Sequence, residues 1–325
     1  MKKEDLKIVF FGTPDFAVES LREILDNGFN VCAVVTATDK IAGRGHKLLS
    51  SPVKNFAVER GLPVLQPEKL KDPEFIKELE SLNADLFIVI AFRMLPEVVW
   101  QMPPLGTFNL HASLLPLYRG AAPINRAIMN GETKTGVTTF FLKHEIDTGD
   151  IIDRVEVDIL PEDNAGDVHD RLMKLGAKLT VRTIKSIVDG TLKTIPQDAY
   201  IEKGIESTPA PKIFKETGHI DWSAPAEKIH NLVRGLSPYP GAWSILMSDV
   251  MSPTEIKILK TANTNQKSQG VPGTISFTKD KLYVNTGSNQ LEVLEVQASG
   301  KKRMAIADYL RGARLVNPYF KDINS

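Results

Sequence analysis

The sequence contains a single cysteine, Cys32, among 325 residues. This excludes an internal disulfide framework and a thiolate cluster that holds a metal, and it fits the reducing cytoplasm. Long hydrophobic runs are also missing: the apolar run at 7–12 is far too short to span a bilayer, and no small-residue cleavage site follows it. We therefore expect a cytoplasmic protein that needs no metal and begins with a strand rather than a signal peptide.

Charge of one sign is not in excess over the whole chain, because 40 basic residues balance 40 acidic residues. The balance hides an asymmetry, since residues 1–208 hold 25 basic and 30 acidic side chains whereas residues 209–325 hold 15 and 10. The basic C-terminal part suggests a polyanionic partner, and chance variation explains the same numbers equally well. With 42% hydrophobic and 25% charged residues, the chain is typical of a globular protein with room for two domains.

The first half of the sequence alternates between strand and helix patterns. Continuous apolar runs bounded by turn residues predict buried strands at 7–12, 31–36, 85–92 and 107–113. Amphipathic segments predict helices, among them 51–61 with a Ser-Pro start and 165–190 ending at a glycine. After the first strand, Thr13 is the expected N-cap and Pro14 the first helical residue. The alternation predicts an α/β fold with a Rossmann-like, doubly wound and mostly parallel sheet.

The second half changes character after residue 190. Residues 191–208 are polar, contain proline and show no periodicity, which predicts a linker. A short helix at 225–237 follows, and then short strand patterns separated by turn residues, which predict a small barrel. We therefore expect one domain at 1–190 and a second, smaller domain at 209–325.

The stretch "TFNLHAS" at 107–113 places a carboxamide and an imidazole two positions apart on a predicted strand. Asn109 and His111 therefore share a face, near the carboxyl end of the strand where open parallel sheets bind ligands. The amide can donate a hydrogen bond to a developing oxyanion, and the imidazole can polarise a carbonyl or move a proton. The alternative is that nearby backbone groups satisfy both side chains.

An acidic residue, Asp147, lies in the predicted turn "HEIDTGDII". A carboxylate beside an imidazole favours the protonated ring and fixes its tautomer. The alternative is an Asx-turn or cap residue. Spacing along the chain does not decide whether Asp147 meets His111.

The stretch "FNLHASLLPLYRGAAPINRAIMNGETKTGVT", followed by "IDTGD", resembles the folate-dependent formyltransferases. In that family the matching Asn, His and Asp form the catalytic triad, which implies these roles for Asn109, His111 and Asp147. The resemblance also implies 10-formyltetrahydrofolate as the formyl donor. The segment that matches the family's folate-binding stretch consists of Ser113, Leu114, Leu115 and Pro116.

The resemblance covers the whole chain. The segments 220–243 and 302–315 are similar to the C-terminal domain of the members that formylate methionyl-tRNA, which implies an OB-like β-barrel that binds tRNA. Members that act on glycinamide ribonucleotide lack this domain. Segment 34–54 resembles the tRNA-contacting loop of the methionyl-tRNA group, and we expect sugar formyltransferases to lack its Gly-Arg-Gly element. Two features depart from the family: Arg93 stands where many relatives have glycine, and "TFFLKH" replaces a Met-rich run.

The same loop concentrates positive charge from Lys40, Arg44 and Lys47, and glycines flank Arg44 on both sides. Such a loop can close on a phosphate backbone, and the alternative is a solvated loop without a ligand. The resemblance implies an enzyme that formylates the α-amino group of methionyl initiator tRNA for translation initiation. We expect it to act as a monomer, without a membrane partner. The alternatives are an amino-sugar nucleotide N-formyltransferase and a non-catalytic RNA-binding protein with a decayed enzyme domain.

Overall fold

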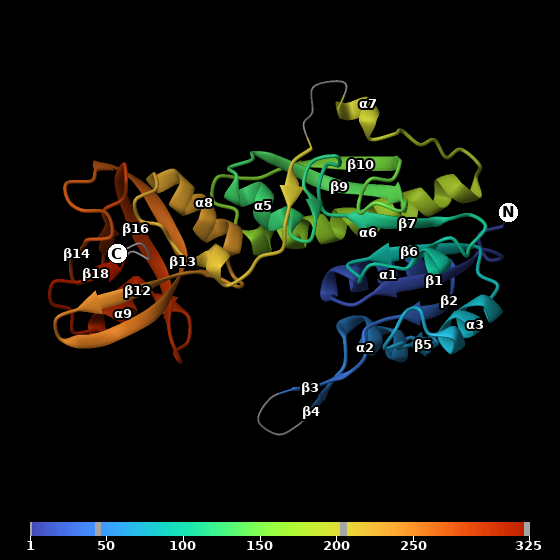
Figure 1. Ribbon diagram of the computed structural model, residues 1–325, viewed down its shortest axis with the longest axis horizontal. Coiled ribbons are helices and arrows are strands. Elements are labelled where there is room, and N and C mark those ends of the chain that lie inside the picture. The colour runs from blue at the N-terminus through green and yellow to red at the C-terminus, as the bar shows by residue number, and fades with distance from the viewer. Residues whose placement is uncertain (1, 43–46, 202–206, 322–325) are drawn as a thin grey trace. The chain divides into compact units, whose positions relative to one another are not determined.

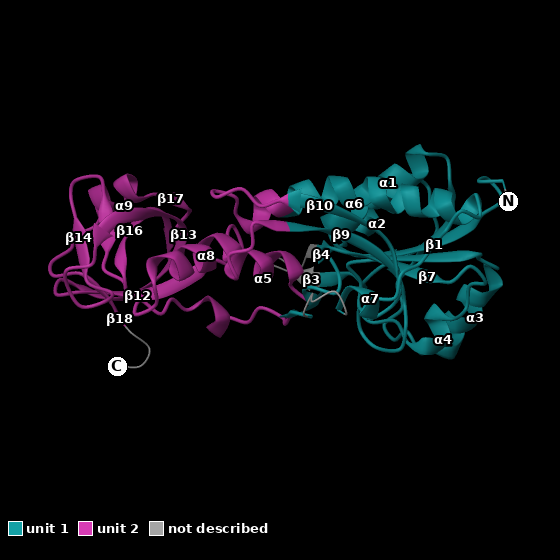
Figure 2. Cartoon of the chain, turned by 90° about the horizontal axis from the view of Figure 1, so that it is seen from above, with its two compact units in different colours: residues 1–120, 135–157, 169–209 teal, residues 121–134, 158–168, 210–325 magenta. Residues whose placement is uncertain are grey.

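The computed structural model describes residues 2–42, 47–201 and 207–321. It divides into two compact units, each assembled from separate stretches of the chain (Figure 2). Unit 1 comprises Met1–Gly120, Thr135–Val157 and His169–Pro209, and unit 2 comprises Ala121–Lys134, Asp158–Val168 and Ala210–Ser325. This division rests on the geometry of the chain. The domain boundaries expected from the sequence at residues 190 and 209 stay a prediction.

Unit 1 is built on a mixed sheet with the strand order β10-β9-β7-β6-β1-β2-β5. The neighbouring pairs from β7 to β5 are parallel, and β9 runs antiparallel to β7. The strands are β1 (Lys7–Gly12), β2 (Asn30–Val35), β5 (Val64–Leu65), β6 (Leu86–Ile90), β7 (Thr107–His111), β9 (Lys134–Phe141) and β10 (Ile151–Asp158). The chain also forms the short strands β8 (Arg119–Gly120) and β11 (Pro209–Ala210). The doubly wound, mostly parallel sheet is confirmed.

Helices cover both faces of this sheet. The helices are α1 (Asp15–Asp26), α2 (Pro52–Glu59), α3 (Pro73–Ser81), α4 (Glu97–Trp100), α6 (Ala165–Val188) and α7 (Asp198–Ile201). Figure 2 shows α1 and α6 on one side of the sheet and α3 and α4 on the other. On the α3 side, Phe75 and Leu79 pack with Val9, Phe11 and the alternate residues of β6 in one buried cluster. Strands enclosed on both faces explain why β1 and β6 read as unbroken apolar runs.

The sequence predicted one helix start correctly and another wrongly. Ser51 is the N-cap of α2 as predicted, and its side chain accepts a hydrogen bond from the backbone N–H of Lys54. The prediction for α1 is wrong: Pro14 is the N-cap, with an extended ψ of 175°, and no side chain caps the helix. Because Pro14 is extended, the first helical residue is Asp15 and Thr13 lies too early to cap it.

Unit 2 contains an antiparallel sheet with the strand order β14-β15-β16-β13-β12-β18. Among these strands, Figure 1 labels β12, β13, β14, β16 and β18. A bridge between Thr274 and Tyr319 joins its two edges, so the sheet curls into a nearly closed barrel, as predicted. Its strands are β12 (Ala242–Ser248), β13 (Met251–Lys267), β14 (Ile275–Phe277), β15 (Leu282–Val284), β16 (Asn289–Ala298), β17 (Met304–Ala305) and β18 (Tyr319–Lys321). The helices of this unit are α5 (Pro123–Met129), η1 (Glu216–Gly218), α8 (Ala226–Leu236) and α9 (Ile306–Gly312).

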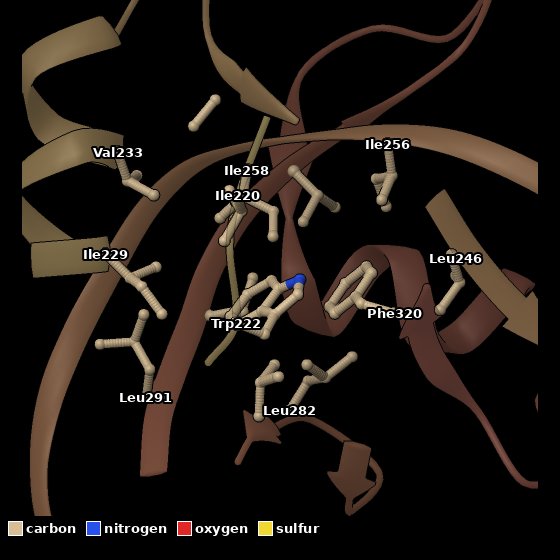
Figure 3. Packing of buried hydrophobic residues seen from close by; sticks show 14 of the residues in the cluster. Ile220, Trp222, Ile229, Val233, Leu246, Ile256, Ile258, Leu282, Leu291 and Phe320 are labelled. Atoms are coloured by element: carbon tan, nitrogen blue, oxygen red, sulfur yellow. The ribbon is translucent and has the colours of Figure 1, made fainter. Parts of the chain in front are cut away.

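Trp222 lies at the centre of the core of unit 2 (Figure 3). Its ring stacks on that of Phe320, with centroids 4.8 Å apart and an interplanar angle of 8°. The indole N–H donates to the buried hydroxyl of Ser244 at 3.1 Å. The indole therefore fills the barrel interior with its one polar atom satisfied.

The described residues contain no helix that is long and apolar enough to cross a membrane.

Candidate active site

Strand β7 carries Asn109 and His111 at alternate positions, as predicted. Asn109 pairs with Val89 of β6 on one side and with Phe140 of β9 on the other, and His111 pairs with Thr138 of β9. Two residues apart on one strand, the amide and the imidazole project from the same face. His111 ends β7, at the edge where open parallel sheets place their ligand sites, and Asn109 lies two residues before it.

The Oδ1 atom of Asn109 is buried and has no hydrogen-bond partner among the described residues. A buried acceptor left unpaired costs about 1–3 kcal/mol, so such atoms are rare in folded proteins. The alternative that backbone groups satisfy this side chain does not hold for Oδ1. The atom is suited to accept a hydrogen bond from a bound ligand.

The imidazole of His111 is held by a backbone carbonyl. Its Nε2 atom lies 2.8 Å from the carbonyl oxygen of Tyr118. A carbonyl oxygen only accepts, so Nε2 carries the hydrogen and donates it. In the neutral ring, Nδ1 is therefore the nitrogen with the lone pair and the one that can take up a proton.

Asp147 lies next to this nitrogen, with 3.9 Å between its Oδ2 atom and Nδ1 of His111. That separation is too long for a hydrogen bond, and it allows a charge interaction once the imidazole is protonated; both side chains are largely buried. The structure therefore brings the predicted Asp147 to His111. The expectation that the carboxylate fixes the tautomer is wrong, because the Tyr118 carbonyl makes the hydrogen bond that does so.

The backbone around the ring is unusual. Tyr118 and Asp147 have φ values of 59° and 56°, in the left-handed region that residues other than glycine rarely adopt. The Oδ2 atom of Asp147 accepts a hydrogen bond from the backbone N–H of Gly120 at 2.9 Å. Gly149 packs directly on the carbonyl oxygen of Phe141, where a Cβ atom would collide with it. Left-handed residues of this kind cluster at functional sites, where the surrounding contacts hold them.

The segment predicted to bind folate is rigidly held. The hydroxyl of Ser113 donates to the carbonyl of Leu117 at 2.6 Å, and the hydroxyl of Thr138 donates to the carbonyl of Ser113 at 2.6 Å. Arg154 donates to the carbonyl of Leu115 at 2.7 Å. Of the four predicted residues, Leu114 is half-buried, and the buried ones are Ser113, Leu115 and Pro116. The segment is preorganised, and a role in folate binding stays a prediction.

The predicted tRNA-binding loop forms a hairpin of β3 (Lys40–Ala42) and β4 (Lys47–Leu49) that extends from unit 1 (Figure 1). Lys40 is exposed on β3, and Lys47 pairs with Ala42 across the hairpin. Arg44 lies outside the described residues. The structure thus places Lys40 and Lys47 on one hairpin and leaves their role a prediction.

The base of this hairpin is tied to α2. Asp39 accepts hydrogen bonds from Lys54 at 2.5 Å and from Gln66 at 3.0 Å. The hydrogen bond from Lys54, followed by that from Gln66, lowers the pKa of Asp39 below its ordinary value. The carboxylate therefore stays charged at neutral pH and anchors the start of the hairpin.

Arg93, which departs from the family pattern, has a local structural role. Its guanidinium donates to the carbonyls of Pro67 and Glu68, the latter at 2.7 Å, and lies over the ring of Phe92. The side chain is therefore fixed on the protein's own backbone.

Other features of the described residues do not compete with this site. Their His, Cys, Asp and Glu side chains form no group of three or more that could hold a metal ion. A shallow hollow of about 250 Å³ lies at the opposite, amino end of β6. It contains none of the predicted site residues and is lined by Leu79, Glu80, Asn83, Ala84, Asp85, Phe87, Met102 and Pro104.

Sequence reasoning missed a buried glutamine that contacts the site, Gln197, which lies in the predicted linker. Its amide touches the backbone of the turn that carries Asp147. A polar residue in a polar, aperiodic segment gives no burial signal. The proline before it and the apolar residues around it, in "TIPQDAYI", were the available sign of local structure.

Two family models match the chain and together cover most of it. The formyl transferase model matches residues 6–184, and the formyl transferase C-terminal domain model matches residues 212–314. The chain is 54% identical to a methionyl-tRNA formyltransferase from Bacteroides thetaiotaomicron, over 98% of this chain and 99% of that protein. It is 53% identical to one from Bacteroides fragilis, over 98% of each chain.

A solved structure shares the fold. A sugar 3N-formyl transferase, crystallised in the presence of dTDP and 5-N-formyl-THF, superposes with a TM-score of 0.64 over 91% of this chain and 99% of that chain. Its identity to this chain is 21%, so the likeness bears on the fold alone. The higher identity with the Bacteroides proteins decides the group within the family. The chain belongs to the formyl transferase family and, within it, to the methionyl-tRNA formyltransferases.

Proposed function

We propose that this chain transfers the formyl group of 10-formyltetrahydrofolate to the α-amino group of methionine on the initiator tRNA. The observation that carries the proposal is the arrangement at the end of β7, in a chain of this family. There Asn109 presents an unpaired buried acceptor, and Nδ1 of His111 lies 3.9 Å from Asp147. An acceptor of this kind suits an N–H donor, which the attacking amine supplies.

Each of the three side chains has a role in this proposal. The Oδ1 atom of Asn109 accepts a hydrogen bond from the incoming amine, and its amide N–H groups are suited to the oxygen of the formyl group as that oxygen gains charge. The amine nitrogen bonds to the formyl carbon, and the bond from that carbon to N10 of the folate breaks with its electron pair left on N10. N10 takes up a proton, and the amine loses one. Nδ1 of His111 is the ring nitrogen that can receive this proton. Asp147 then stabilises the imidazolium by its charge.

We further propose that residues 1–190 form the catalytic domain and residues 209–325 the tRNA-binding domain, with 191–208 between them. The excess of basic over acidic side chains in residues 209–325 supports a role in binding tRNA. The segment from Ser113 to Pro116 contributes to the folate site. The protein acts as a monomer in the cytoplasm, where charged tRNA is its substrate.

A direct assay tests the function. The purified protein is incubated with 10-formyltetrahydrofolate and either methionyl initiator tRNA or an amino-sugar nucleotide. We expect formyl-methionyl-tRNA to form and the amino sugar to stay unmodified. Transfer to the sugar alone would identify a sugar N-formyltransferase, and binding of tRNA without any transfer would identify a non-catalytic RNA-binding protein.

Substitution of Arg44 tests the tRNA-binding hairpin. Because a charge-assisted hydrogen bond contributes about 1.5–3 kcal/mol, we expect Arg44→Ala to lower kcat/KM for charged tRNA about tenfold or more. The KM for formyl-folate should be unchanged. Arg60→Ala is a matched control, since it removes the same charge from an exposed position at the far end of α2. An equal loss for both substrates would show that Arg44 supports the fold of the loop rather than tRNA binding.

A further inference from the structure

We propose that Gln197 is a positioning residue that holds Asp147 beside His111; this inference rests on the proposed function. Gln197 lies between Pro196 and α7, and the residue is 2% exposed. Neither the family motif nor the predicted triad includes it. Its side-chain hydrogen-bond partners among the described residues lie within unit 1.

The amide of Gln197 uses its full hydrogen-bonding capacity. Its Nε2 atom donates to the carbonyl oxygens of Asp147 and Gly149, both at 2.8 Å. Its Oε1 atom accepts from Nε and Nη2 of Arg119, at 3.0 and 2.6 Å. Carbonyls only accept and a guanidinium only donates, so the orientation of the amide is chemically fixed.

These four hydrogen bonds join the two segments that hold the carboxylate. One segment is the turn 147–149. Gln197 donates hydrogen bonds to the backbone carbonyls of this turn on both sides of Thr148. The other is the short strand β8, where Arg119 precedes the Gly120 N–H that donates to Oδ2 of Asp147. Gln197 therefore holds the Asp147 carboxylate in two ways. It binds the backbone of Asp147 itself, and through Arg119 it holds the strand whose Gly120 N–H donates to that carboxylate.

The backbone conformation of the turn 147–149 requires stabilising contacts of this kind. Asp147 has a φ of 56°, which residues other than glycine hold only when the surroundings impose it. The exposed side chains of Glu145 and Ile146 precede it, so burial does not fix the turn on its N-terminal side. The hydrogen bonds from Gln197 add to the constraints from the Gly120 N–H and from the packing of Gly149 on Phe141.

The position of Gln197 is itself well defined. On its N-terminal side, Ile195 and Ile151 exchange backbone hydrogen bonds at 2.8 and 2.9 Å. On its C-terminal side, Tyr200 packs against a buried cluster of Leu115, Phe140 and Ile151, and Arg154 lies 4.2 Å above its ring. The segment 195–201 is thus attached on both sides of the glutamine, beginning at the edge strand β10.

The test is a double-mutant cycle with Asp147. We expect Gln197→Ala to lower kcat about ten- to a hundredfold, because a displacement of ~1 Å at a catalytic group costs on that order. The KM values for formyl-folate and charged tRNA should change less than about twofold, since Gln197 touches neither substrate in this proposal. In an Asp147→Ala background, Gln197→Ala should have no further effect on kcat, because it acts through the carboxylate.

Two further variants keep the test decisive. Gln197→Glu preserves the volume and the acceptor for Arg119 and loses both donations to the turn, so it should lower kcat even if Gln197→Ala does not fold. Gln297→Ala removes a glutamine that donates to the carbonyl of Lys301 in unit 2, and kcat should stay as in the wild type. Wild-type kcat in folded Gln197 variants, or a full additive loss in the Asp147→Ala background, would overturn the inference. Absence of transfer by the wild-type protein would instead refute the proposed function.

Discussion

Replacing Asn109 by alanine is expected to lower kcat for formyl transfer by about 10²–10³-fold while leaving folding stability unchanged or slightly higher. The loss follows from removing a donor aimed at the developing oxyanion. Stability should not fall, because Oδ1 makes no hydrogen bond in the described structure and the change removes an unsatisfied buried atom. The measurements are steady-state kinetics with charged tRNA and formyl-folate, and urea unfolding followed by circular dichroism.

Ser20→Ala is the matched control for this experiment. The hydroxyl of Ser20, on α1, is also buried and without a partner among the described residues, but it lies outside the site. Its removal should change neither kcat nor KM. If Asn109→Ala kept the wild-type kcat, or if both variants lost activity in parallel with stability, the role assigned to Asn109 would be wrong.

Replacing Trp222 by alanine should lower the free energy of unfolding by about 3–5 kcal/mol, the usual cost of removing a buried large aromatic side chain. Trp222 is 2% exposed, stacks on Phe320 and donates to the hydroxyl of Ser244. The variant would leave both a cavity in the barrel and a buried hydroxyl without its donor. Urea unfolding measures the change.

Two variants separate the contributions. Trp222→Phe keeps an aromatic ring against Phe320 and loses the indole N–H, so its cost should be clearly smaller than that of alanine. Tyr239→Ala removes an aromatic ring that is 79% exposed, and its effect should lie within about 0.5 kcal/mol of zero. A loss below about 1 kcal/mol for Trp222→Ala would mean that the barrel does not depend on this packing.

Features that follow from local chemistry were predictable from the sequence. The unbroken apolar runs of β1 and β6 indicate strands buried on both faces, and the two-residue spacing of Asn109 and His111 places them on one face of β7. Ser51 before Pro52 marks a helix start because both residues suit their positions. Asp147 came from the family motif, and its distance from His111 came only from the structure.

Other features have no local signature. The group that fixes the ring of His111 is the backbone carbonyl of Tyr118, and any residue type supplies a carbonyl. The burial of Gln197 arises from contacts with Arg119 and the turn at 147–149, which are distant in sequence, so its polar surroundings predicted a linker. Helix α1 begins one residue later than predicted, because Pro14 is extended. Side-chain preferences alone do not determine this backbone conformation.

The interleaving of the two units restricts how the polypeptide can be divided. The chain crosses from one unit to the other five times, at residues 120, 134, 157, 168 and 209. In unit 2, Asn125 of α5 donates to the carbonyl of Gly235 in α8 at 2.8 Å, although the two residues lie far apart in sequence. A protease that cuts once between residues 190 and 210 would therefore leave an N-terminal fragment that still carries α5, and the two cleaved pieces would stay associated until denatured.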